Sequence, residues 1–105
     1  MQTEIQDEVV WRLNTTAGHL HAIQEMVNAG RPCEEVINQL IAVKAALRVV
    51  ETRLLAYQVM RSAEIILNGS KEARIAELAR LYDLYVLLLT SCQNPNRLPL
   101  TPTIE

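Results

Sequence analysis

The feature that most constrains this chain is a stretch of 36 residues, 33–68, that contains neither glycine nor proline. It lies between Pro32 and Gly69, and its apolar residues recur at helical spacing. A helix of this length would extend about 54 Å at 1.5 Å per residue, whereas a compact chain of this size has a radius of gyration of about 13 Å. Its apolar positions cover more than one narrow stripe, so a single neighbouring helix cannot bury them all. The sequence therefore predicts that long helices of separate copies pack against one another.

Two shorter helices and a tail complete the predicted domain. Apolar periodicity predicts helices over about 3–29, 32–67 and 70–90. Together they form an all-α, three-helix protomer over residues 1–91, with a long central helix. Residues 92–105 carry three of the four prolines, which is typical of a flexible tail.

Local residues predict where these helices begin and end. Thr3 and Gln6 have the spacing of a capping box. Pro32 fits the first position of the long helix, and Ser70 fits an N-cap. Gly18 lies inside the first predicted helix, at a cost of about 1 kcal/mol relative to alanine. Close packing of another helix would explain this glycine.

Charge and composition exclude several classes of function. The 105 residues carry a net charge of −2, and residues 1–30 hold one strong base, Arg12, against four acids, for a net of −3. This chain lacks the basic footprint of an obvious nucleic-acid binder. It also lacks a membrane-length apolar run and a signal-peptide pattern, so a cytoplasmic location without a membrane partner is expected. A disulfide between Cys33 and Cys92 is not expected there.

Catalytic and cofactor patterns are missing as well. The sequence offers no Ser-His-Asp set, no acidic pair with an evident apolar pocket and no phosphate-cradling glycine loop. We therefore expect neither an enzyme nor a bound cofactor.

Several motifs are similar to those of the CsoR/RcnR family, small bacterial repressors that sense metals or thiols. The similarity extends from about Arg12 to Leu89. The residues that carry it are Arg12, Leu13, Gly18 and His19; the run C-x-x-V-x-x-Q-L-x-A-V-x-A-A-L from Cys33 to Leu47; and Ala73, Ile75, Glu77 and Leu78. The resemblance implies an antiparallel dimer, commonly doubled into a tetramer, that releases operator DNA when its inducer binds.

The resemblance also assigns a ligand site, which is degenerate in this chain. Cys33 matches the family cysteine at the start of the second helix, which faces a pair of ligands on another subunit. That pair falls on Gln58 and Ser62, where relatives carry histidine and a second ligand. Glu77 becomes a candidate for hydrogen bonding behind the ligand residues. Because copper(I) and nickel sites prefer thiolate and imidazole, metal sensing of the usual kind is not expected.

Cys33 itself has two interpretations. It could be a sensor thiol, since a helix N-terminus favours the thiolate and Arg31 adds to this effect. The acidic Glu34 and Glu35 oppose it, so the sequence leaves the reactivity open. The alternative is a buried cysteine with a packing role.

The resemblance places the DNA-binding surface on basic side chains of the first and second helices. The matching candidates are Arg12, His19, His21, Lys44 and Arg48. Three positions that are commonly basic in relatives are not basic here. They are Asn14, Thr15 and Ala17. Each lost phosphate contact removes a counterion-release contribution, so weak operator binding is expected. His19 and His21, two residues apart, point to different faces of a helix, and as a pair they are expected to be surface or hydrogen-bonded histidines rather than ligands.

Two functions from different classes follow. The first is a CsoR/RcnR-like transcriptional regulator, a DNA-binding repressor with an altered, non-metal inducer. The alternative is a helical scaffold that has lost metal and operator binding and engages a protein partner.

Overall fold

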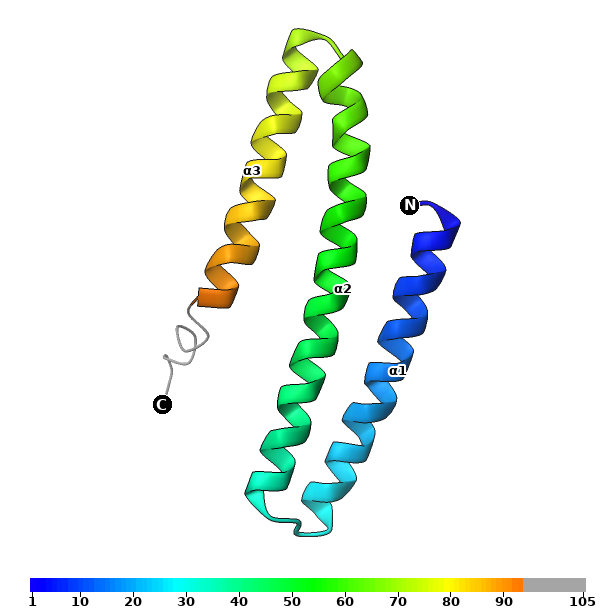
Figure 1. The fold of residues 1–105 in the computed structure, drawn as a ribbon, viewed down its shortest axis with the longest axis vertical. Coiled ribbons are helices and arrows are strands. Elements are labelled where there is room, and N and C mark those ends of the chain that lie inside the picture. Colours follow the sequence, from blue (N-terminus) through cyan, green and yellow to red (C-terminus); the bar gives the residue numbers. More distant parts are fainter. Residues whose placement is uncertain (94–105) are drawn as a thin grey trace. The chain divides into compact units, whose positions relative to one another are not determined.

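Three α-helices make up the part of the chain that the computed structural model describes, residues 1–93. They are α1 (Thr3–Asn28), α2 (Cys33–Asn68) and α3 (Lys71–Gln93) (Figure 1). No strand occurs in this part of the chain. The prediction of an all-α protomer with a long central helix is confirmed. Residues 92 and 93, which the sequence assigned to the tail, are helical, and the remainder of the predicted tail lies outside the described residues.

The chain divides into two units, Met1–Gln58 and a second that begins at Val59. In the first unit, α1 runs antiparallel to the adjoining part of α2 (Figure 1). The seam between the two helices buries Val9 and Ile23 of α1 against Val43 and Val50 of α2. Within each helix these residues repeat at intervals of seven or fourteen positions, which keeps them on one face.

The link between α1 and α2 contains two residues that suit a helix end, Gly30 and Pro32. Gly30 has a φ of 71°, a conformation that costs residues with a Cβ atom about 1 kcal/mol or more. Its amide donates to the Val27 carbonyl at 3.1 Å, which closes the end of α1. The carbonyl of Pro32 accepts the amide of Val36 at 3.2 Å, so Pro32 occupies the N-cap of α2 rather than its first helical position.

The first turn of α1 differs from expectation. Gln2 is the N-cap residue, and no side chain caps this end. The predicted capping box of Thr3 and Gln6 is therefore wrong. The extended backbone of Gln2 places Thr3 inside the helix, where its hydroxyl no longer faces the free amides.

In the second unit, α3 runs antiparallel to the adjoining end of α2 (Figure 1). Ser70 caps α3, as predicted, because its hydroxyl accepts the amide of Ala73 at 3.2 Å. Inside this unit, the Ser62 hydroxyl of α2 donates a hydrogen bond to the Glu77 carboxylate of α3. Ser62 and Glu77 are buried polar residues, whereas helices that pack together usually bury apolar side chains at such positions.

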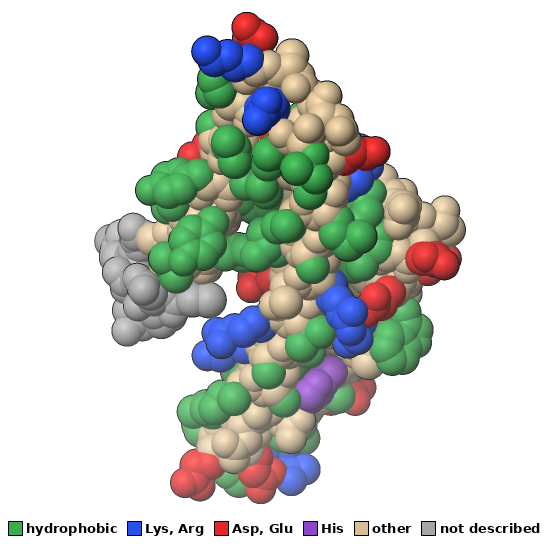
Figure 2. Space-filling view, turned by 45° about the horizontal axis from the view of Figure 1, so that its top comes forward, with side chains coloured by type: hydrophobic (Ala, Val, Ile, Leu, Met, Phe, Trp, Pro, Cys, Tyr) green, Lys and Arg blue, Asp and Glu red, His purple; other side chains and the backbone are tan. Residues whose placement is uncertain are grey.

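The apolar core of the described chain is small. Among residues 1–91, whose burial the structure describes, only Val9, Ile23, Val43 and Val50 are buried apolar residues. Large apolar side chains are exposed on all three helices, and Figure 2 shows many of them gathered where α2 and α3 meet. Large exposed apolar patches of this kind are typical of interaction surfaces.

Replacing Gly69 or Gly18 by alanine is expected to change the stability of the protein in opposite directions. A Cβ atom on Gly69 would lie 2.6 Å from the Ile65 carbonyl oxygen, whereas one on Gly18 would have nothing within 4 Å. The expected close packing at Gly18 is therefore not present within the described chain. Gly69→Ala is expected to lower the free energy of unfolding by about 1–3 kcal/mol. Gly18→Ala is expected to raise it by up to about 1 kcal/mol.

The measurement is urea unfolding followed by circular dichroism at one protein concentration, since the stability of an oligomer depends on concentration. Each variant serves as the control for the other. A stabilising Gly69→Ala would contradict the clash, and a strongly destabilising Gly18→Ala would indicate that another molecule packs against this glycine.

Candidate functional site

Cys33 opens α2, and its side chain is exposed in the described chain. The alternative of a buried packing cysteine is therefore not supported within one protomer. Arg31, which was expected to favour the thiolate, pairs with the carboxylate of Glu35 one helical turn away. The cationic charge nearest in sequence is thus already balanced. The Cys33 thiol is therefore accessible, and Arg31 already has an ionic partner in Glu35.

Ser62 is the most deeply buried residue of the described chain, with 0% of its surface exposed. Its hydroxyl donates to Oε2 of Glu77, so it points toward α3. Gln58 lies one turn earlier on α2 and is half-buried. Both positions thus carry neutral side chains, and the hydroxyl of Ser62 is already committed to a carboxylate.

Glu77 is a buried acid, with 8% of its surface exposed. Besides the Ser62 hydroxyl, the Nη1 atom of Arg80 lies 3.6 Å from its Oε2 atom. Arg80 itself is largely exposed, with 63% of its side-chain surface accessible, so this ion pair is screened by water. The structure therefore brings Ser62 and Glu77 together, two of the residues that the sequence analysis singled out.

These side chains do not fit a metal ion of the kind that thiolate and imidazole sites hold. Among the side chains that the structure describes, residues 1–91, no three of His, Cys, Asp or Glu are grouped so that they could hold a metal. The two positions that the resemblance assigns as ligands carry an amide and a buried, hydrogen-bonded hydroxyl. Copper(I) and nickel(II) prefer softer donors than these.

Two of the three predicted DNA contacts on α1, Arg12 and His19, have partners in the first unit. Arg12 is half-buried and its Nε atom donates to Oε2 of Glu8 at 2.9 Å. The same oxygen lies 3.2 Å from Nε of Arg53 on α2. His19 shares a 2.7 Å hydrogen bond with the side-chain oxygen of Gln39. Arg12 and His19 thus have partners within the protein.

Sequence reasoning missed the shared role of Glu8 and Arg53. The spacing of Glu8 and Arg12, four residues apart on one helix, predicts their pairing. Arg53 is 45 positions further along the chain than Glu8, and only the antiparallel packing of α1 and α2 brings it to the same carboxylate.

The remaining predicted contacts are exposed. His21 lies 3.4 Å from the carboxylate of Glu25, a pair that is ionic only when the ring is protonated. Lys44 and Arg48 are exposed on α2. Of the five predicted DNA contacts, Arg12 and His19 thus have partners within the first unit, and the other three are exposed.

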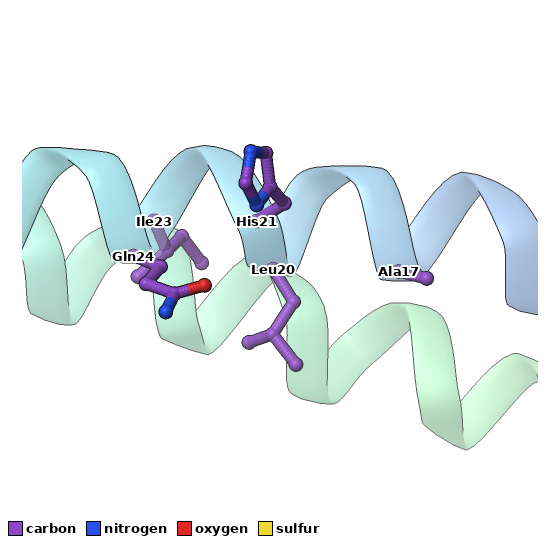
Figure 3. A pocket seen from close by; sticks show the side chains of 5 residues that line it. All are labelled: Ala17, Leu20, His21, Ile23 and Gln24. Carbon is purple, nitrogen blue, oxygen red and sulfur yellow. The ribbon is translucent and has the colours of Figure 1, made fainter.

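A hollow lies on the surface of α1 beside the predicted histidines (Figure 3). It is lined by Ala17, Leu20, His21, Ile23 and Gln24. In Figure 3 the Leu20 side chain points toward α2, while the His21 ring points away from it. All five residues belong to one helix, so the hollow is a shallow apolar depression rather than an enclosed ligand site.

Residues 1–93 thus form a small all-α protein in which a buried Ser62–Glu77 pair joins α2 to α3. Residues 5–83 match the family model described as metal-sensitive transcriptional repressor, and the chain belongs to this family. The family is one of repressors rather than enzymes. No curated protein and no solved structure shows a significant match to the chain. No helix among residues 1–93 is long and apolar enough to cross a membrane.

Proposed function

We propose that the protein is a cytoplasmic, DNA-binding transcriptional repressor that works as an oligomer and responds to an inducer other than a metal ion. The observation that carries the first part is the family match over residues 5–83. The second part rests on Ser62, whose hydroxyl is buried and bonded to Glu77 where a metal site would need a soft donor. The exposed Cys33 thiol is the proposed sensing group, with Gln58 and Ser62 as remnants of the ligand pair.

Exposed apolar stripes on α1 and α2 support self-association. The α1 stripe contains Val10, Leu13, Ala17, Leu20 and Val27, and the α2 stripe contains Ile37, Leu40, Ile41 and Leu47. The stripe residues lie one, four or five positions beyond a position of the heptad repeat of their own seam, which turns them from the seam by roughly 40–140°. The turn has the same sense in both helices, and the helices are antiparallel, so both stripes come to one side of the hairpin. A second copy on this side would complete a four-helix bundle, the smallest assembly of two hairpins.

The sequence-independent contribution to the affinity for operator DNA is expected to be small. The net charge is −2 per chain, and Arg12 is already paired with Glu8. Phosphate contacts by Lys and Arg supply most non-specific affinity. Specific recognition would then depend on the few base contacts that an oligomer repeats by symmetry.

The pairing of Arg12 also favours the second candidate, a helical scaffold that binds a protein partner and no longer binds an operator. A repressor would keep its arginines available for phosphates, whereas Glu8 holds both Arg12 and Arg53. The two functions differ in whether any DNA sequence is selected.

Selection of genomic DNA fragments by the purified protein, with and without reductant, tests this proposal. One enriched promoter whose binding changes on oxidation supports the repressor and the sensing thiol. We expect shifts on unrelated DNA at moderate salt to need micromolar protein, because few phosphates are neutralised. Nanomolar binding to unrelated DNA would contradict that expectation, and no enrichment at low salt would favour the scaffold.

A further inference from the structure

Two arginines from different helices converge on one carboxylate oxygen of Glu8. The Nε atom of Arg12, one turn further along α1, lies 2.9 Å from Oε2 of Glu8, and the Nε atom of Arg53 on α2 lies 3.2 Å from the same oxygen. All three residues belong to the first unit, Met1–Gln58. The exposed fraction of each side chain is between 32% and 50%, so a small solute can reach the cluster from water.

One carboxylate is a limited acceptor for two guanidinium groups. Each guanidinium presents a planar fork of N–H donors that pairs best with two oxygens of the same anion. Here both Nε atoms approach a single oxygen, and the one negative charge of Glu8 faces the two positive charges of Arg12 and Arg53. A terminal phosphate group has three acceptor oxygens and a charge of about −1.5 to −2 at neutral pH. It would therefore match the two arginines better than Glu8 does, both in charge and in number of acceptors.

The cluster could instead serve to join α1 to α2, but other contacts already do so. The seam between the helices buries apolar residues of both, and His19 of α1 shares a hydrogen bond with Gln39 of α2. Ion pairs that are a third to a half exposed are screened by water and contribute little to stability. Glu8 can therefore leave the two arginines at a small energetic cost, as a displaceable occupant of an anion site must.

We propose that Arg12 and Arg53 form a binding site for a terminal phosphate group of a small molecule, and that Glu8 occupies this site until the ligand displaces it. The bound phosphate would accept N–H groups from both arginines, and the Glu8 carboxylate would turn into water, because two anions repel each other at such distances. Glu8 is tethered beside the arginines and competes at a high local concentration, so it weakens the binding of the ligand. This site requires only the first unit of one chain and does not depend on the proposed repressor function.

Titration calorimetry with inorganic phosphate at low ionic strength tests the proposal. Glu8→Gln is expected to raise the affinity for phosphate about tenfold or more, because it removes the competing anion. Glu8→Asp keeps the net charge but shortens the side chain, so it is expected to raise the affinity as well. The matched control is Glu4→Gln, which removes the same charge from an exposed residue of α1 that makes no ion pair within residues 1–91. This control is expected to change the affinity less than about twofold.

A second pair of variants tests the arginines in the Glu8→Gln background. Adding Arg53→Gln is expected to abolish the gain, whereas adding Arg74→Gln, at an exposed position of α3, should preserve it. Equal affinities in Glu8→Gln and Glu4→Gln, or a gain that survives Arg53→Gln, would overturn the site. Circular dichroism of each variant shows whether the helices are retained.

A last arm compares inorganic phosphate with a fluorescent DNA duplex of unrelated sequence, whose binding is followed by anisotropy. A gain that Glu8→Gln shows only with the duplex would overturn the assignment to a small phosphate ligand and move the site to the nucleic-acid backbone. The genomic selection uses the unaltered protein, so failure of the repressor function is read separately from failure of this site.

Discussion

Copper(I), nickel(II) and zinc(II) are expected to bind the purified protein weakly, and Cys33→Ala is expected to change their affinities no more than severalfold. The reason is the donor set at the two positions that the resemblance assigns as ligands. Gln58 offers an amide, and the hydroxyl of Ser62 is buried and committed to Glu77. Neither replaces thiolate or imidazole for a soft or borderline metal. Competition with a chromophoric chelator under anaerobic, reducing conditions measures the affinities.

Restoring the donors should produce a large gain. The double variant Gln58→His, Ser62→Cys is expected to raise the copper(I) affinity at least about a hundredfold, because an imidazole and a thiolate one turn apart share a helix face. The matched control is Gln58→His with Ala63→Cys, which adds the same donors five residues apart on different faces. Tight binding by the unaltered protein that disappears in Cys33→Ala would show that a functional metal site is present. Equal affinities in the two double variants would show that the positions are not ligand positions.

The helices of this protein could be predicted from the sequence because their ends depend on local backbone chemistry. Gly30 adopts the positive φ that ends α1, and the hydroxyl of Ser70 caps α3. The absence of glycine and proline between Pro32 and Gly69 predicted one continuous helix, and α2 spans that interval. The capping box at Thr3 failed because the helix begins one residue earlier than that motif requires. Boundaries of this kind depend on which of several adjacent polar residues takes the cap.

The site was harder to predict because its contacts join helices. The hydrogen bond between Ser62 and Glu77 spans 15 positions, and the ion pair between Glu8 and Arg53 spans 45. No local pattern encodes either, since both depend on which faces of antiparallel helices meet. The resemblance to a family singled out Ser62 and Glu77 separately, but only the packing of α3 on α2 shows that one binds the other. The resemblance assigns a ligand to position 62, and the structure has a buried hydroxyl there that donates to Glu77.

Ser62→Ala is expected to lower the free energy of unfolding by about 1–3 kcal/mol, because it leaves the buried carboxylate of Glu77 without that donor. Glu77→Met, which keeps the length of the side chain but removes its charge, is expected to be destabilising by a similar amount, since the buried hydroxyl of Ser62 then loses its acceptor. The double variant should be much less destabilised than the sum, because replacing both partners of a buried polar pair by apolar groups is often nearly neutral. Urea unfolding at one fixed protein concentration gives all four corners of this cycle.

The control for this cycle is Glu72→Met, the same substitution at an exposed position of α3, which should change the stability little. Additive effects of Ser62→Ala and Glu77→Met would contradict a direct contact. The Ser62 hydroxyl would then be available to bind a ligand. A strong positive coupling would instead mean that any ligand placed at position 62 must first break the bond to Glu77.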